Sequence, residues 1–224
     1  GSAFETAGVN YIMNPYDEWY ALVRALELKE AHGGTVTIIN VGTAANDAVI
    51  RKGLAIGADN AVRVNADPKS SLFIAKQIAE HAKGEGYDAI FCGKESIDYN
   101  GSEVGAMVAE MLNLPFISFA NNMDLNGNTA EVSRDIEGGT EIAEVELPIV
   151  VSAAKGMAEQ RIPNMRGIMM AKRKPLTVVE PVDFADVSVP IHFQLPPEKG
   201  GCVYVEPDNM DELVRLLHEE AKVV

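Results

Sequence analysis

The chain has little cysteine and a shortage of positive charge. Only Cys92 and Cys202 occur among 224 residues, which indicates buried or incidental thiols in a reducing compartment. Against 33 Asp and Glu stand 19 Lys and Arg, and the net charge of -14 argues against nucleic acid or an anionic membrane surface as a partner. No apolar run approaches the roughly 18 residues needed to cross a bilayer. We therefore expect a cytoplasmic protein, or a mitochondrial-matrix protein if the source is eukaryotic.

Several signatures of catalysis are also missing. The four histidines lack metal-ligand spacing, so we expect no metal site. Ser96 and Ser102 have no nearby histidine and no strained elbow, which argues against a hydrolase triad. No Walker sequence, clean G-x-G-x-x-G or S-G-G-x-D-S loop is present. These absences argue against a metal site, a hydrolase triad and the known phosphate-loop signatures.

Helical and strand-like patterns alternate through the first half of the chain. Helical spacing is found at 17–32, 46–56 and 69–83, and short apolar runs lie at 35–41, 61–64 and 89–92. This alternation predicts an α/β fold with a doubly wound, mostly parallel, Rossmann-like sheet. We expect an α/β domain over 1–185 and a C-terminal extension over 186–224. Ligands of such sheets lie beyond the carboxyl ends of the strands.

The most informative stretch runs from Gly86 to Leu112. A buried strand, Ala89–Cys92, ends at Gly93, and a polar loop then leads into an amphipathic helix that begins near Val104. Free N–H groups and the positive end of the helix dipole meet at such a helix start, where they hold anions. The loop is therefore the first candidate for a binding site.

After Pro115 the pattern changes. Two antiparallel strands are predicted at 130–135 and 141–147, and a core strand at 147–152. The segment 155–174 fits no regular element well, yet it carries six cations and one anion on an acidic chain. Its methionines favour a contact surface, although they could also tuck back into the core. A final amphipathic helix is predicted over 208–223, where it caps the domain or clasps a partner.

Five landmarks in this order resemble the β (small) subunit of electron-transfer flavoproteins. They are Asn14-Pro15-Tyr16-Asp17, Ala55-Ile56-Gly57-Ala58-Asp59, Gly93-Lys94-Glu95-Ser96-Ile97-Asp98, Asp135-Ile136-Glu137-Gly138-Gly139 and Ile168-Met169-Met170-Ala171-Lys172-Arg173-Lys174-Pro175. The resemblance covers nearly the whole chain. It implies an electron-carrier subunit rather than an enzyme, paired with a larger α subunit that carries redox-active FAD. Such heterodimers take electrons from acyl-CoA and related dehydrogenases, as in fatty acid oxidation, and pass them to a membrane quinone reductase.

The resemblance also implies a structural nucleotide in this subunit, most commonly AMP. Its site would use the start of the first helix, one strand end and the polar loop: Asn14, Pro15, Tyr16, Asp17, Val41, Gly93, Lys94, Glu95, Ser96, Ile97, Asp98, Tyr99, Asn100, Gly101, Ser102, Glu103 and Val104. The loop departs from the usual D-D-x-N-Q-T-G ending, because Glu103 replaces an amide and Val104 replaces a threonine. The valine is similar to the electron-bifurcating branch, in which a second FAD occupies the AMP position.

The basic segment corresponds to the recognition loop of the family. In ungapped register its apolar anchor is Met165, with Ile162, Arg161 and Arg166 around it as partner-docking residues. By the same resemblance Tyr16 lies against the α-subunit flavin, or else packs internally as a helix-start aromatic.

Family members usually begin about twenty-five residues earlier, with a strand in the middle of the sheet, and this sequence starts Gly-Ser without that strand. We therefore expect the sequence to be incomplete at that end. Two other classes stay open. One is a stand-alone adenine-nucleotide-binding module of the universal-stress type, and the other is an ATP-using enzyme of the same broad fold. The long segment 155–174 argues against the stand-alone module. The absence of a pyrophosphate-binding loop argues against the ATP-using enzyme.

Overall fold

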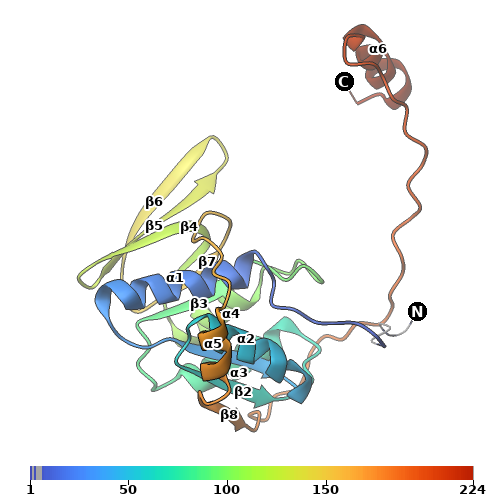
Figure 1. Ribbon diagram of the computed structural model, residues 1–224. Helices are drawn as coiled ribbons and strands as arrows, with labels where there is room; N and C mark the ends of the chain where they lie inside the picture. Colours follow the sequence, from blue (N-terminus) through green and yellow to red (C-terminus); the bar gives the residue numbers. More distant parts are fainter. Residues whose placement is uncertain (2, 4–6, 224) are drawn as a thin grey trace. The chain divides into compact units, whose positions relative to one another are not determined.

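The computed structural model describes residues 1, 3 and 7–223 (Figure 1). Its contacts divide the chain into two compact units, Glu5–Pro190 and a second unit made of Gly1–Phe4 with Ile191–Val224. The larger unit contains both sheets and nearly all of the buried core.

The larger unit alternates helices and strands over its first half and is strand-rich afterwards. Its helices are α1 (Asp17–His32), the short η1 (Ala44–Asn46), α2 (Asp47–Ile56), α3 (Ser71–Ala82), α4 (Val104–Leu112) and α5 (Met165–Ala171). Its strands are β1 (Thr37–Gly42), β2 (Asn60–Asn65), β3 (Ala89–Gly93), β4 (Phe116–Asn126), β5 (Thr129–Ile136), β6 (Gly139–Glu146), β7 (Ile149–Ala153) and β8 (Leu176–Val179). The order βαβ over β1 to β3 is the crossover arrangement that the sequence predicts.

The strands form two hydrogen-bonded groups, ordered β1-β2-β8 and β3-β7-β4-β5-β6. Every pair is parallel except β4 with β5 and β5 with β6, which make the antiparallel hairpins. The mostly parallel α/β class is thereby confirmed. Among the described strands, β1 and β3 each pair on one side only, although both are short apolar strands of the kind found inside parallel sheets.

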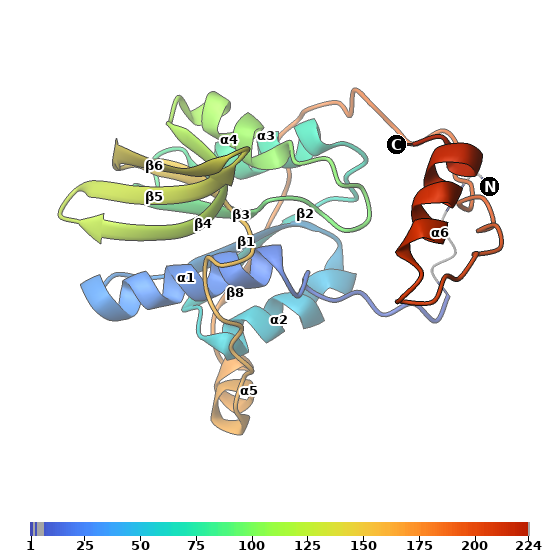
Figure 2. The same cartoon turned by 90° about the horizontal axis from the view of Figure 1, so that it is seen from above.

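Helices cover both faces of the strands (Figures 1 and 2). Helix α1 contributes to two core clusters. Ala21 packs with strands of the five-stranded group, and Leu22 and Leu26 pack with α2 and the β1 side. On the opposite face of β3, α3 and α4 meet around Ala75 and Val108, with Ile90 of the strand against them. Alternate residues of β3 thus face different helices, as the period of two requires.

Most of the predicted elements are confirmed. The helix over Asp17–His32 has the predicted bounds, and the hairpin of β5 and β6 and the core strand β7 lie where the sequence places them. The expectation that 155–174 contains no regular element is wrong, because α5 forms there with the Asn164 side chain capping its first turn. The long strand β4 and the short β8 were not predicted.

The smaller unit is largely without regular structure until its end. Helix α6 (Met210–Arg215) continues into η2 (Leu216–Ala221), a wider π-type turn. The predicted helix over 208–223 is thus confirmed within two residues at each end. Asn209 caps α6, and the Arg215 guanidinium pairs with Glu212 and Glu219. Several apolar side chains of this unit, among them Leu195 and Tyr204, are almost fully exposed.

Candidate functional site

The candidate site lies at the carboxyl end of β3, where the chain meets the first turn of α1. Gly93 ends the strand and allows this close approach. A methyl group added there would stand 2.9 Å from the Glu18 carboxyl carbon and 3.0 Å from the Asp17 Cβ. The strand end and the helix start are therefore held in direct contact, and a side chain at Gly93 would push them apart.

Asn14 ties the segment before α1 to the loop after β3. Its Nδ2 donates to the Glu95 carbonyl at 3.2 Å and lies 3.5 Å from an Asp17 carboxylate oxygen, and its Oδ1 accepts from the Tyr16 backbone N–H at 3.0 Å. One amide side chain therefore bonds to two segments about eighty residues apart. The structure thus brings together two of the three parts of the predicted nucleotide site.

The loop after β3 is organised by polar contacts of its own. Lys94 forms an ion pair with Glu95 at 2.9 Å, and the Ser102 hydroxyl donates to the other Glu95 oxygen at 3.3 Å. The Tyr99 N–H donates to the Ser96 hydroxyl, which closes a turn. Asn100 adopts a left-handed backbone conformation, one that asparagine tolerates better than most residues. These contacts order the loop, which leads directly into α4.

The first turn of α4 has no side-chain cap. Its N-cap residue is Glu103, whose side chain makes no capping hydrogen bond, and the carboxylate instead lies over Gly101, 3.2 Å from where a Cβ would be. The unpaired N–H groups of this nine-residue helix therefore stay available to an anion. Gly105 is needed for packing, since a Cβ there would stand 3.0 Å from the Phe116 ring.

Buried carboxyl groups dominate the electrostatics beside this loop. Burial, and to a smaller extent the neighbouring Asp17 charge, raises the pKa of Glu18 to about 7, although two hydrogen bonds act to lower it. One Glu18 carboxylate oxygen is buried and has no hydrogen-bond partner. Burial also raises the pKa of Asp17, while the nearby Lys94 charge lowers it. The hydrogen bond from Lys94 lowers the pKa of Glu95, so this pair stays ionised.

The other predicted nucleotide-site residues are placed less centrally. Val41 is buried near the end of β1, in the three-stranded group, whereas the loop leaves the five-stranded group. Tyr16, Ile97 and Tyr99 are exposed. The Pro15 carbonyl accepts a hydrogen bond from the Gln160 side chain, which links the start of α1 to the basic segment.

The chemistry of this site fits an adenine nucleotide. The uncapped N–H groups of α4 and the Lys94 ammonium suit a phosphate, and Asn14 lies at the edge of the same loop with donor and acceptor atoms that suit an adenine edge. The Glu103 carboxylate at the start of α4 opposes a phosphate.

The predicted docking segment is anchored to α2. The Lys174 ammonium donates to three carbonyls at the end of α2, those of Leu54 at 2.9 Å, Gly57 at 3.3 Å and Ala58 at 2.5 Å. Arg51 donates to the carbonyls of Ala171 and Lys174 at 2.8 and 2.6 Å. A cation at the negative end of α2 is also favoured by the helix dipole. Helix α5 is therefore fixed, and Figure 2 shows it projecting from the α2 side of the larger unit.

The start of the docking segment is anchored to α1. The Arg161 guanidinium donates to both carboxylate oxygens of Glu30, at 2.6 and 2.9 Å, and the Trp19 indole N–H donates to the Arg161 carbonyl at 3.2 Å. The Lys52 ammonium stands 4.3 Å from the centre of the Trp19 ring. Arg161 thus holds the segment in place. Sequence patterns gave no signal for these partners, because each contact joins segments far apart in the chain.

Between these two anchors the apolar side chains point outward. Ile162, Met165 and Met169 are 87%, 75% and 68% exposed, and we refer to these three residues as the methionine face. Arg166 is exposed beside it. Three large apolar side chains held open on an anchored segment are typical of a protein contact surface.

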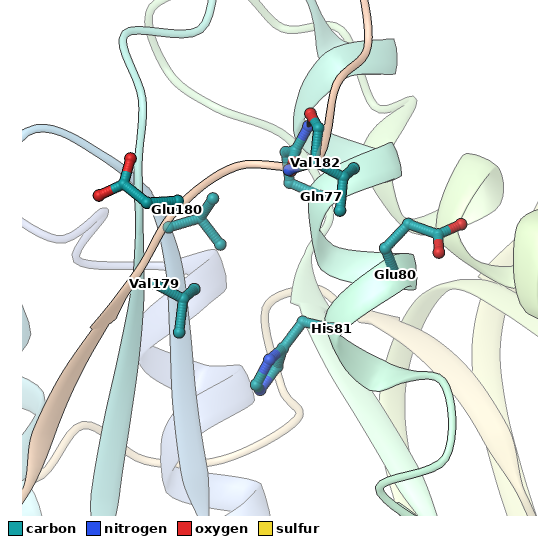
Figure 3. Close-up of a pocket in the computed structure, with 7 residues that line it drawn as sticks. Gln77, Glu80, His81, Val179, Glu180 and Val182 are labelled. Carbon is teal, nitrogen blue, oxygen red and sulfur yellow. Dashed lines mark hydrogen bonds between the residues drawn. The ribbon is translucent and has the colours of Figure 1, made fainter.

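A cavity of about 190 Å³ lies between α3 and the ends of β2 and β8 (Figure 3). Val64, Val179 and Val182 give it an apolar lining, and the buried Nε2 of His81 has no hydrogen-bond partner. The Glu80 carboxylate turns away from the cavity in Figure 3 and pairs with Lys76 and Lys83. Within the described part of the chain, no group of three His, Cys, Asp or Glu residues is placed to hold a metal ion.

Comparison with known proteins identifies the relatives of this chain. The electron transfer flavoprotein domain matches residues 2–184. Proteins described as electron transfer flavoprotein subunit beta are similar over most of their length. One from Bacillus subtilis is 38% identical over 232 residues, covering 97% of this chain and 90% of that protein, and one from Syntrophomonas wolfei is 36% identical over 205 residues, covering 90% and 81%. The human protein of that description is 33% identical over 228 residues, covering 97% and 88%.

The chain therefore belongs to the electron transfer flavoprotein family and is similar to its β subunits. The family resemblance found in the sequence is confirmed. Membership favours an electron carrier over the stand-alone nucleotide-binding module and over the ATP-using enzyme. Among the described residues no helix is long and apolar enough to cross a membrane.

Proposed function

We propose that this protein is the β subunit of a heterodimeric electron-transfer flavoprotein. In this role it binds a structural nucleotide at the α1–β3–α4 site and docks partner dehydrogenases, while FAD on the α subunit shuttles the electrons. The observation that carries the proposal is the hydrogen bond from the Asn14 side chain to the Glu95 carbonyl. It joins two sequence landmarks of the family next to the uncapped start of α4. The redox chemistry belongs to the flavin, and this chain supplies binding and positioning.

The nucleotide is AMP, held through its phosphate by the N–H groups at the start of α4 and by Lys94. Asn14 would contact the adenine, and its bond to the Glu95 carbonyl fixes its orientation. FAD is the alternative in a bifurcating member, because FAD contains the same adenosine phosphate. Val104 supports that alternative, since it supplies no hydroxyl where α4 begins.

The smaller unit contacts the α subunit. Leu195, Tyr204 and Val214 are exposed apolar residues on an arm that buries little of its own surface. Surface of this kind is stable in water only when a partner covers it. We therefore propose that 186–224 wraps the larger subunit and contributes to the heterodimer interface.

The methionine face docks acyl-CoA or related dehydrogenases, and a quinone reductase accepts the electrons. Flexible thioether side chains adapt to different partner surfaces, which suits a carrier that serves several donors. The exposed Arg166 adds a charge at the rim of this apolar centre. The anchors at Lys174 and Arg161 keep the face extended.

Among the described strands, β1 and β3 are each unpaired along one edge. Both edges leave backbone N–H and C=O groups unpaired, and α1 on one face contributes to the cores of both strand groups. We place the proposed heterodimer in the cytoplasm, or in the mitochondrial matrix if the source is eukaryotic.

The test is co-expression with a neighbouring reading frame that encodes a larger flavin-binding subunit, with an affinity tag on this chain alone. A yellow one-to-one complex supports the heterodimer. Purification of this chain as a stable homo-oligomer without flavin would overturn it in favour of a stand-alone module. The matched variant lacks residues 191–224. It should no longer retain the partner subunit, while its larger unit stays folded.

A further inference from the structure

The methionines of this protein are distributed unevenly over its surface. Met123 and Met157 are fully buried, at 0% and 2% exposure, and Met170 and Met210 are about half exposed, whereas Met165 and Met169 are the most exposed methionines, at 75% and 68%. The latter two are four residues apart in α5, so they lie on one side of the helix. Two thioether sulfurs are thus presented together to solvent.

The opposite side of α5 explains why these side chains stay outward. Gly167 lies directly against the Ala55 carbonyl of α2, and Ala171, four residues on, is buried. Any side chain at Gly167 would collide with that carbonyl. Because the small residues and the Lys174 anchor fix this side to α2, the helix has no freedom to turn the methionines inward.

We propose that Met165 and Met169 are the sites at which peroxide modifies this protein, and that their oxidation weakens partner docking. Each thioether sulfur attacks one oxygen of hydrogen peroxide, the O–O bond breaks, and water leaves as the sulfur becomes a sulfoxide. The sulfur is oxidised by two electrons, and the peroxide is reduced. Exposure governs the rate of this reaction, and a methionine sulfoxide reductase reverses it.

Oxidation changes the chemistry of the methionine face at its centre. A sulfoxide oxygen is a strong hydrogen-bond acceptor, so burying it against an apolar partner pocket costs free energy that a thioether does not. Because the two sulfurs are neighbours, both would be desolvated in the same contact. This consequence rests on the proposed docking role, whereas the oxidation itself does not.

The first measurement is peptide mass spectrometry of the intact heterodimer after brief treatment with millimolar hydrogen peroxide. We expect oxygen uptake at Met165 and Met169 at least about tenfold faster than at Met123 and Met157, as their exposure dictates. Equal rates at the four positions would overturn the proposal. Adding a purified acyl-CoA dehydrogenase in excess should slow oxidation at the exposed pair only.

The second measurement is electron transfer from a substrate-reduced acyl-CoA dehydrogenase to the heterodimer. When the heterodimer is present at limiting concentration, peroxide treatment should reduce the rate of electron transfer about tenfold. Methionine sulfoxide reductase should restore that rate. The double variant M165L/M169L is compared with its own untreated transfer rate, and it should keep most of that rate after peroxide treatment. An equal peroxide loss in wild type and in the leucine variant would overturn the inference, because the damage would then lie elsewhere.

An untreated M165Q/M169Q variant separates the two proposals. Glutamine places a polar group on the same face without any oxidant. Weaker transfer in this variant supports the docking surface. Normal transfer would show that partners dock elsewhere, whatever the oxidation rates are, and would overturn the proposed effect of oxidation with it.

Discussion

The Asn14 side-chain amide donates a hydrogen bond to the Glu95 backbone carbonyl at 3.2 Å, and so joins the start of α1 to the loop after β3. The same side chain accepts from the Tyr16 N–H. Two landmarks that are far apart in sequence thereby form one site. Only the Asn14 end of this hydrogen bond can be removed by substitution, because the Glu95 end is a backbone carbonyl.

Asn14→Ala should weaken AMP binding by the heterodimer about tenfold and lower the free energy of unfolding by about 1 kcal/mol, since one hydrogen bond and one turn contact are lost. Isothermal titration with AMP and urea unfolding measure the two effects. Asn128→Ala, in the exposed turn after β4, is the matched control and should change neither. Unchanged affinity in Asn14→Ala would remove Asn14 from the nucleotide site.

Glu103→Gln should tighten AMP binding about threefold, because it removes a negative charge from the start of the helix proposed to hold the phosphate. The gain should shrink as salt is added. Titration at low and high ionic strength measures it, with the exposed Glu110→Gln on the same helix as the control. A loss of affinity would instead assign Glu103 a direct contact with the ligand.

Glu18 should make stability fall as pH rises. Its folded pKa of about 7 lies above the ordinary value of 4.5, so its contribution is fully present below pH 4.5 and is lost as pH rises through 7. At pH 8, Glu18→Gln should therefore be more stable than wild type, by up to about 3 kcal/mol. Urea unfolding of both proteins at pH 5 and pH 8 tests this, with the exposed Glu131→Gln as control. A constant difference between pH 5 and pH 8 would contradict it.

Lys174→Met should loosen α5. It removes three hydrogen bonds to the carbonyls that end α2, at a cost of about 1–3 kcal/mol. Hydrogen exchange should become faster in α5 and at the end of α2, while β7 stays protected. Lys172→Met, whose side chain is exposed, is the control. Equal protection of α5 in both variants would mean that Arg51 alone holds the helix.

Local patterns predicted the larger unit well because its elements are regular. The helix over Asp17–His32 carries apolar spacing and glycines behind it, and both of its predicted ends are correct. Helix α5 was missed because it is short and Gly167 interrupts its pattern, although that glycine packs against the Ala55 carbonyl of α2. Strand β4 was missed because Asn121 and Asn122 disfavour strands and a bulge interrupts its pairing.

The segments that form the candidate site could be predicted from the sequence, but the hydrogen bonds between them could not. The strand–loop–helix pattern after Ala89 indicated an anion site, and the structure places an uncapped helix start there. The partners of Asn14 and the buried state of Glu18 arise only when α1 packs against β3. Such contacts depend on tertiary geometry, which a local pattern does not encode.

The most direct test of the proposed role is to denature the purified heterodimer and to identify and count the released nucleotides by chromatography. We expect two nucleotides per heterodimer, FAD from the α subunit and AMP from this one. Two FAD per heterodimer would assign this subunit to the bifurcating branch, with the same site occupied. A single FAD and no second nucleotide would contradict the binding site at Asn14 and α4.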